Sequence, residues 1–212
     1  MRGFDPSLIP LNPDLSFEQI LWQGGEIAVA GVDEAGRGAL AGPVAAAAVI
    51  LPADQKVSGL LPGVRDSKQM TPLERDIARE RIQRFCIAWG VGFSSPGEID
   101  QVGIVAATRL AAWRAIERLT PPPTHLLLDY LFLPELAIPQ TALIKGDCRS
   151  LSIAAASIMA KTSRDALLAE LDLTYPEYGF ANHKGYGTRS HRDALQRLGP
   201  SPIHRLSFTL YR

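Results

Sequence analysis

The sequence predicts an α/β protein with a mixed sheet, helices on the faces of that sheet, and a helical C-terminal segment. Apolar runs of strand length alternate along the chain with longer segments whose apolar residues recur at helical spacing. The first two runs are joined by a glycine-rich link, which indicates an antiparallel hairpin with an unusually elaborate loop, whereas helices separate most of the later strands. This combination indicates a mixed sheet and argues against a sandwich or a barrel.

The first half of the chain contains an irregular start, two helices and the hairpin. Residues 1–16 carry Pro6, Pro10 and Pro13, and we expect an irregular N-terminal extension there. "SFEQILWQGG" predicts a short helix with Ser16 as its N-cap. The apolar runs 27–32 and 44–51 form the hairpin, and "TPLERDIARERIQRF" predicts a helix over 71–85 with Thr71 as its cap and a proline at its first position.

The second half supplies the remaining strands and the two longest helices. Strands are predicted over 86–95, 125–130 and 141–147, and helices over 98–119 and 150–172. The tail from about 172 to 212 begins with an aromatic- and glycine-rich stretch and then becomes helical. We therefore expect one domain over 17–212 that includes this tail as an appendage.

Composition narrows the class of protein without identifying a function. The 212 residues include 22 basic and 22 acidic side chains, so net charge does not indicate a partner. Cys86 and Cys148 match no metal-ligand spacing and are interpreted as reduced thiols of a cytoplasmic protein. No segment reaches the roughly 20 apolar residues of a membrane span. We expect a cytoplasmic protein that is a monomer and has no membrane partner.

Acidic side chains lie at the downstream ends of three predicted strands. Asp33, Asp129 and Asp147 each occupy such a position, and Glu34 directly follows the first of them. If the three strands are neighbours that run in the same direction, these acids converge at one edge of the sheet. Adjacent residues of a strand point to opposite faces, but a twist into "AGRG" at the end of the strand can bring Asp33 and Glu34 to one site.

Four crowded carboxylates repel one another, so a cation has to offset their charge. Oxygen ligands without His or Cys suit Mg²⁺ or Mn²⁺. Carboxylate clusters that hold two such ions about 3.5–4 Å apart catalyse phosphodiester cleavage. The alternative is structural: a single Asp at the end of a strand is commonly a turn former or a cap, Asp-Glu pairs are common on surfaces, and a Gly-x-Gly loop is a weak signal.

Four longer motifs resemble those of one family. They are "AGVDEAGRGALAGPVAAAAVILP", "RDSKQMTPLER", "KGDCRSLSIAAASIMAKTSRD" and "YPEYGFANHKGYGT". Their order and approximate spacing are similar to those of bacterial ribonuclease HII, the type 2 ribonuclease H family, over Phe17 to Phe208. The resemblance implies a ribonuclease H-like, five-stranded mixed sheet flanked by helices, with a C-terminal helical segment.

The resemblance also implies an activity. Asp33, Glu34, Asp129 and Asp147 would bind two Mg²⁺ or Mn²⁺ ions, one activating the attacking water and the other stabilising the departing 3′ oxygen. The expected enzyme is an endoribonuclease that cuts the RNA strand of RNA/DNA hybrids and also cuts at single ribonucleotides in duplex DNA. Its products would carry 5′-phosphate and 3′-hydroxyl ends, and its role would be to clear misincorporated ribonucleotides.

Substrate recognition requires groups that read one 2′-hydroxyl, which both donates and accepts hydrogen bonds. By resemblance, this task falls to the loop residues Gly36, Arg37 and Gly38, and to Tyr186, which would pack on the sugar next to the cut. A glycine loop suits the task because its backbone can approach the hydroxyl closely. A phosphate-binding surface is expected from four basic residues, with solvated charge as the alternative: Lys145, Lys161, Arg164 and Lys184.

Other polar residues near these motifs have structural interpretations. Asp165 is expected to pair with Lys161 four residues earlier. Ser157 is interpreted as a small residue that allows close packing, and His183 suits either the site or a structural hydrogen bond. Three further histidines are interpreted as structural: His125, His191 and His204.

Two positions depart from the family pattern, and two other functions remain open. Tyr130 stands where the family usually has glycine, so a different turn there would displace Asp129; Ala39 replaces a usual proline. One alternative is another ribonuclease H-fold nuclease such as a junction resolvase, which would not need the Gly-Arg-Gly loop or Tyr186. The other is a non-catalytic nucleic-acid-binding protein, against which the intact acids argue.

Overall fold

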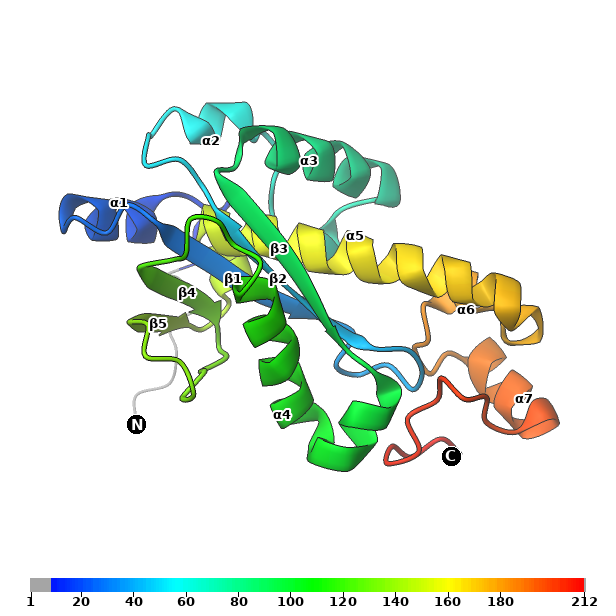
Figure 1. The fold of residues 1–212 in the computed structure, drawn as a ribbon. Coiled ribbons are helices and arrows are strands. Elements are labelled where there is room, and N and C mark those ends of the chain that lie inside the picture. The colour runs from blue at the N-terminus through cyan, green and yellow to red at the C-terminus, as the bar shows by residue number, and fades with distance from the viewer. Residues whose placement is uncertain (1–8, 212) are drawn as a thin grey trace.

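A five-stranded sheet forms the centre of the computed structural model, which describes residues 9–211 (Figure 1). The order across the sheet is β3-β2-β1-β4-β5. The strands are β1 (Val29–Ala35), β2 (Val44–Ile50), β3 (Ala88–Ser94), β4 (His125–Asp129) and β5 (Gln140–Leu143). The helices are α1 (Ser16–Gln23), α2 (Val57–Leu60), α3 (Pro72–Phe85), α4 (Pro96–Ile116), α5 (Leu151–Thr174), α6 (Phe180–His183) and α7 (Arg189–Leu198).

The pairing of the strands confirms the mixed sheet. β1 and β2 form an antiparallel hairpin, and β3 pairs antiparallel with β2. On the other side β1 runs parallel to β4, and β4 runs parallel to β5. The three strands expected to run in the same direction are therefore neighbours, and their carboxyl ends meet at one edge of the sheet.

Each face of the sheet packs on different helices, as Figure 1 shows. Alternate residues of β2 point in opposite directions: Ala46 and Ala48 face α4, whereas Ala47 and Val49 face α5 and α3. The all-apolar run of β2 is thus explained by burial on both faces, since every residue of the strand is buried.

Glycines bring both large helices unusually close to the strands. A Cβ built on Gly31 of β1 would lie 2.1 Å from the backbone carbon of Ser152 in α5. On the other face, a Cβ on Gly92 of β3 would lie 2.2 Å from the carbonyl oxygen of Ala111 in α4. A side chain at either position would push the helix away from the sheet, so these glycines determine the distance between the layers.

The predicted N-cap of α3 is confirmed and that of α1 is wrong. Thr71 caps α3 in a capping box with Glu74, and Pro72 occupies the first helical position. In α1, Ser16 is the first helical residue and not the cap. Asp14 supplies the capping acceptor, because its Oδ1 accepts hydrogen bonds from the Ser16 N–H at 2.8 Å and from the Ser16 hydroxyl at 2.6 Å.

Two strand ends differ from the prediction in a way that matters for the acids. β1 continues through Ala35, so Asp33 and Glu34 lie within the strand and not beyond it. β5 ends at Leu143, and Asp147 lies in a short 3-10 helix over Gly146–Cys148. Lys145 causes this difference, because its left-handed backbone (φ 54°) turns the chain out of the strand direction.

The chain around the sheet agrees with the other expectations within the described range. α6 lies alongside the C-terminal part of α5, and α7 follows it as the rest of the expected helical appendage (Figure 1). Residues 1–8 of the predicted irregular extension lie outside the described residues. Cys86 and Cys148 are free thiols. Within residues 9–211, every helix is too short or too polar to cross a lipid bilayer.

Candidate active site

Three acids from separate segments meet at the edge of the sheet where β1 and β4 end. Asp33 comes from β1, Asp129 is the last residue of β4, and Asp147 lies in the 3-10 helix after β5. One carboxylate oxygen of each lies within 4.8 Å of the others. The convergence follows from the parallel pairing of β1 with β4 and of β4 with β5.

Backbone N–H groups hold two of these carboxylates in place. Asp33 Oδ1 accepts a hydrogen bond from the Glu34 N–H at 2.7 Å, and Asp129 Oδ1 accepts one from the Gly146 N–H at 2.7 Å. The second bond ties the end of β4 to the turn that carries Asp147. The relative position of the two acids is thereby determined by backbone geometry.

The cluster has the electrostatics of a cation site. Burial and the charges of Glu34 and Asp129 raise the pKa of Asp33 well above its ordinary value. Burial and the charge of Asp147 raise the pKa of Asp129 to about 6. Lys68 Nζ lies 3.7 Å from Asp147, but that side chain is mostly exposed and offsets one charge at most. Carboxylate oxygens without histidine fit Mg²⁺ or Mn²⁺.

Glu34 stands beside the three clustered acids and is not part of their triangle. Its Oε1 accepts a hydrogen bond from Arg37 at 3.0 Å. Its Oε2 is buried and has no partner among the described residues. A buried carboxylate oxygen without a donor is costly, and a bound cation would satisfy it. The fourth acid therefore fits a cation that lies between it and the triangle.

Tyr130 preserves the turn after Asp129. Its backbone is left-handed (φ 54°), the conformation that a glycine adopts easily, and its N–H donates to the Leu143 carbonyl at 2.9 Å. The ring is 76% exposed. The departure from the family pattern thus changes the exposed surface and leaves Asp129 among the other acids.

A loop and an open groove of about 460 Å³ lie next to the acids. We call residues 36–43, between β1 and β2, the recognition loop. The predicted loop residues, Tyr186 and basic side chains all line this groove. Its lining residues are Glu34, Ala35, Gly36, Arg37, Gly38, Ser67, Lys68, Lys161 and Tyr186. The expected juxtaposition of the glycine loop with Tyr186 is therefore present.

Cations lie near the ring of Tyr186. Lys161 Nζ is 5.8 Å from the ring centroid, and the same ammonium group pairs with Asp165 at 2.7 Å, as expected. Lys145 is exposed at its turn, and the half-buried Lys184 donates to the Ala181 carbonyl. Lys161 is the predicted basic residue that lines the groove directly.

The expectation that Arg164 belongs to a phosphate-binding surface is wrong. Its side chain is fully buried, and its guanidinium donates to the carbonyls of Ala41, Pro43 and Lys184. These contacts leave it no access to a substrate phosphate. The sequence could not separate a solvated arginine of α5 from a buried one, because both occur at helical spacing beside small residues.

His125 lies on β4, where its Nε2 is 2.9 Å from the Thr141 hydroxyl oxygen. The other three histidines form a structural cluster behind Tyr186, and their hydrogen bonds define their tautomers. The Ser201 N–H donates to His204 Nδ1 at 2.8 Å, so His204 carries its proton on Nε2 and donates to His191 Nε2 at 3.0 Å. His191 then donates from Nδ1 to the Tyr186 carbonyl at 3.0 Å. His183 accepts from the Gly185 N–H, which gives it a structural position as well.

Residues with less obvious signals also support the acids. Burial and the nearby charges raise the pKa of Asp33, and a hydrogen bond with Ser157 partly opposes that shift. The Ser157 and Ser67 hydroxyls lie 2.9 Å apart, so Ser157 does more than allow close packing. Arg205 is buried in the C-terminal segment, and the polar local sequence "HRLSF" gives no indication of that burial.

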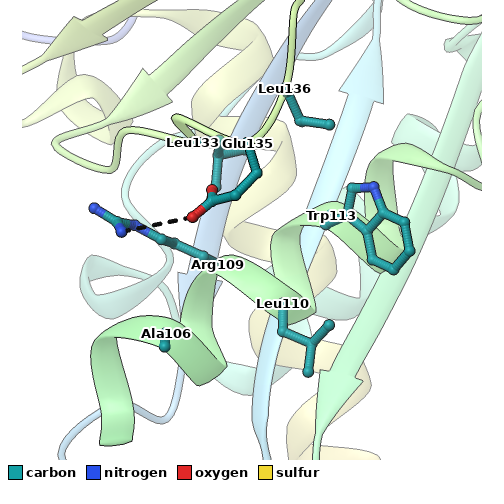
Figure 2. A pocket seen from close by; sticks show the side chains of 7 residues that line it. All are labelled: Ala106, Arg109, Leu110, Trp113, Leu133, Glu135 and Leu136. Carbon is teal, nitrogen blue, oxygen red and sulfur yellow. Dashed lines mark ion pairs between the residues drawn. The ribbon is translucent and has the colours of Figure 1, made fainter. Parts of the chain in front are cut away.

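A second, mostly apolar pocket of about 320 Å³ lies apart from the acids (Figure 2). It is formed by α4 and the segment after β4, and Trp113, Leu110 and Leu133 line it. Arg109 and Glu135 pair across it at 3.8 Å. None of its lining residues belongs to the acid cluster or the recognition loop, and its apolar lining does not suit a phosphodiester.

The sequence matches one family over nearly its whole length. The profile of the family described as Ribonuclease HII matches residues 30–211. A "Ribonuclease HII" of Desulfitobacterium hafniense (strain Y51) is 54% identical over 191 residues, which cover 90% of this chain and 72% of that protein. A "Ribonuclease HII" of Synechococcus sp. (strain JA-3-3Ab) is 55% identical over 202 residues, covering 95% and 90%.

Solved structures of similar fold carry related titles. The crystal structure of ribonuclease H2 from Pyrococcus horikoshii OT3 superposes with a TM-score of 0.71 at 27% identity, covering 86% of this chain and 94% of that one. RNase HII of Archaeoglobus fulgidus, solved in complex with PCNA, gives 0.73 at 25% identity, covering 87% and 96%. Bst-RNase HIII in complex with Mn²⁺ shares the fold at 16% identity, with a TM-score of 0.65 and coverage of 87% and 68%.

Proposed function

Since the chain belongs to the ribonuclease HII family, an endonuclease family acting on the RNA strand of RNA/DNA hybrids, we propose that it also cuts at single ribonucleotides within duplex DNA. The cut would leave a 5′-phosphate and a 3′-hydroxyl. Its role would be to remove ribonucleotides from DNA. The observation that carries the proposal is the acid cluster beside a groove that the recognition loop and Tyr186 line together.

Asp33, Glu34, Asp129 and Asp147 would hold two Mg²⁺ or Mn²⁺ ions. When bound, such ions activate water and stabilise the leaving 3′ oxygen. Two observations support two positions: three acids form one triangle, and Glu34 has a buried oxygen without a partner beside it. The raised pKa of Asp33 indicates that its carboxylate needs a positive charge nearby to stay ionised at neutral pH.

The groove supplies the contacts that would orient the substrate. The peptide groups of Gly36 and Gly38 lie beside it without side chains and can approach a 2′-hydroxyl, while Tyr186 would pack against the adjoining sugar. Lys161 and Lys68 line the same groove and would neutralise backbone phosphates. All these groups come from one chain, so we propose that a monomer is sufficient.

The test is cleavage of an end-labelled DNA duplex that carries one ribonucleotide, with Mg²⁺ or Mn²⁺ and with a chelator. We expect a single metal-dependent cut on the 5′ side of the ribonucleotide and no cut in an all-DNA duplex. Asp33→Asn should reduce the rate by on the order of 10²-fold or more, because it removes a charge from the cluster. Glu170→Gln, on the exposed part of α5, is the matched control and should keep the full rate.

The two alternatives give different results in the same assay. Cutting of the all-DNA duplex would point to a junction-resolving or other deoxyribonuclease, and would refute recognition of the 2′-hydroxyl. Binding without cutting in either metal, by a folded chain, would point to a nucleic-acid-binding protein. Cleavage of a long hybrid without cleavage at the single ribonucleotide would overturn the finer proposal.

A further inference from the structure

Two buried arginines lie behind the recognition loop. Arg164 comes from α5 and Arg205 from the C-terminal segment, and both side chains are inaccessible to solvent. We propose that this pair positions the recognition loop and Tyr186 for reading the 2′-hydroxyl without touching the substrate. This inference rests on the function proposed above and adds two residues to it.

The guanidinium groups hold the loop through its backbone carbonyls. Arg164 donates from Nε to the Pro43 carbonyl at 2.8 Å and from Nη2 to the Ala41 carbonyl at 3.0 Å. Arg205 donates from Nε to the Gly42 carbonyl at 2.9 Å and from Nη1 to the Arg37 carbonyl at 2.9 Å. Four of the eight peptide units of the loop are therefore bonded to a rigid, planar donor.

The same guanidinium of Arg164 joins the loop to the opposite side of the groove. Its Nη1 donates to the Lys184 carbonyl at 2.9 Å, and its Cζ lies 5.5 Å from the centroid of the Tyr186 ring. A backbone bond from the Leu40 N–H to the Gly185 carbonyl at 2.8 Å runs alongside. Arg164 thus sets the spacing between the two groups expected to read the sugar.

The absence of a side chain at Gly36 allows Arg164 to lie against the loop. Its backbone is left-handed (φ 89°), and a Cβ built on it would lie 2.0 Å from Arg164 Nε. The glycine therefore lets the guanidinium lie flat against the back of the loop while the front of the loop lines the groove. Any other residue would displace either the loop or the arginine.

Burying two like charges side by side is unfavourable, which argues against simple packing. Among residues 9–211, neither guanidinium has a carboxylate at ion-pair distance. Burial, and then the charge of Arg164, lower the pKa of Arg205 to about 9. If these side chains only had to fill the space behind the loop, apolar side chains would do so without the free-energy cost of burying a charge. Rigid donors are needed where carbonyl positions must be held closely.

The experiment compares two substrates that differ in one group. A DNA duplex carries at one position either a ribonucleotide or its 2′-fluoro analogue, which cannot donate a hydrogen bond. The readout is the ratio of the cleavage rates, for wild type and for Arg164→Lys and Arg205→Lys. Lysine keeps the charge and loses the forked donor geometry. Arg114→Lys is the matched control, since Arg114 donates to the Phe93 carbonyl on the α4 side of the sheet.

We expect each variant to reduce the ratio by about 10- to 100-fold, because only the 2′-hydroxyl substrate depends on the loop position. Arg114→Lys should leave the ratio unchanged even if it lowers stability. If Arg164→Lys and Arg205→Lys fold and lower both rates equally, or neither, the arginines do not position the loop. Failure of the wild-type chain to cut the ribonucleotide duplex would instead refute the proposed function.

A milder variant covers the case in which both lysine variants fail to fold. Asp100, on α4, accepts hydrogen bonds from the Leu206 and Ser207 N–H groups and so anchors the segment that carries Arg205. Asp100→Ala removes this anchor, and with it a carboxylate whose charge favours the protonated Arg205 guanidinium, but leaves Arg205 itself in place. We expect it to lower the ratio by about threefold, in the direction of Arg205→Lys. An unchanged ratio in this variant would contradict the proposal.

Discussion

Asp33 and Asp129 show how single residues of the site oppose the stability of the fold. Each accepts a backbone hydrogen bond, yet burial and like charges raise the pKa of both carboxyl groups. A carboxyl whose pKa is raised on folding destabilises the fold at any pH above that value. The acids are therefore placed for a cation and not for the stability of the metal-free chain.

The variant Asp129→Asn tests, at pH 8, whether the charge of Asp129 destabilises the metal-free chain. The amide keeps the oxygen that accepts from the Gly146 N–H and removes one negative charge. We expect the metal-free variant to be more stable than wild type by roughly 2 kcal/mol, because the pKa of Asp129 is raised to about 6. Thermal unfolding in chelator measures this difference.

Adding Mn²⁺ should make wild type more stable than Asp129→Asn, which is the reverse of the order in chelator. Wild type gains about 2.7 kcal/mol at 100 times the dissociation constant, and the variant gains much less because it lacks a ligand. Asp54→Asn, on an exposed turn, serves as the control and should respond as wild type does. A variant that is less stable than wild type in chelator would contradict the electrostatic explanation.

Tyr130 allows a second test at the same scale. A left-handed backbone costs a non-glycine residue about 1–2 kcal/mol, and the exposed ring of Tyr130 gives little in return. Tyr130→Gly should therefore raise the unfolding free energy by up to about 1 kcal/mol, after allowing for the greater flexibility of glycine in the unfolded chain. Denaturant unfolding measures the change, and cleavage should persist. Loss of cleavage would assign the tyrosine a role in the reaction.

The sequence predicted some of these residues and not others for a physical reason. The acids could be located because strand ends are visible in the apolar pattern, and Asp33, Asp129 and Asp147 do converge. Arg164 was placed on the surface because charge normally indicates exposure, and Arg205 gave almost no signal. Burial of an arginine depends on carbonyl groups brought together from distant segments, which no local pattern contains.

At the scale of elements, the contact between β1 and α5 positions the site. α5 begins just after the turn that carries Asp147, and it lies directly on Gly31 of β1. Glu18 of α1 holds the N-terminal end of α5 in place, because its buried carboxylate accepts hydrogen bonds from the Ser150 and Ser152 hydroxyls. Two of the clustered acids are thus attached to elements whose separation depends on one glycine.

Gly31→Ala tests that dependence. Its Cβ would meet the backbone of α5 at 2.1 Å, so the helix has to move away from the sheet. We expect a loss of roughly 3 kcal/mol in the unfolding free energy, measured in denaturant. Gly59→Ala in α2, where a Cβ meets nothing within 4 Å, is the control and should be neutral or slightly stabilising. Equal effects of the two substitutions would mean that the layers adjust freely.

The order and types of the strands and the long helices were predictable, but several of their ends and the short helix α2, in a region expected to be a loop, were not. Apolar periodicity predicted every strand of the sheet and the long helices, because burial on one or both faces produces that pattern. β5 was predicted to reach Asp147 and stops at Leu143, because Lys145 adopts a left-handed backbone that favours glycine but does not require it. The capping of α1 by Asp14 was missed for a similar reason, since Ser16 is an equally good cap residue.

For the whole molecule, the C-terminal segment adds its own contribution to how stability depends on pH. Burial, more than the other charges around it, lowers the pKa of His191 from 6.5 to about 4. The native chain therefore stays neutral at His191 where the unfolded chain binds a proton. The stability that this neutral histidine contributes is complete above pH 6.5 and is lost as the pH falls toward 4.

His191→Asn isolates this contribution. The amide can still donate to the Tyr186 carbonyl, but it does not titrate, and it gives up the bond to His204. Between pH 6.5 and 4, wild type should lose up to roughly 3 kcal/mol more unfolding free energy than the variant does. Denaturant unfolding at a series of pH values measures the two slopes. Parallel slopes would show that His191 has the same pKa in the native and the unfolded chain, which contradicts the explanation.

The hydrogen bonds from Arg205 to the loop at residues 36–43 have a consequence for the order in which the chain folds during synthesis. During synthesis, Asp33, Asp129 and Asp147 leave the ribosome before Arg205 does. Until then the loop at residues 36–43 lacks the two hydrogen bonds that Arg205 donates. The two hydrogen bonds join residues that lie far apart in the sequence, so the loop can complete its backbone contacts only after the C-terminal segment has folded against it.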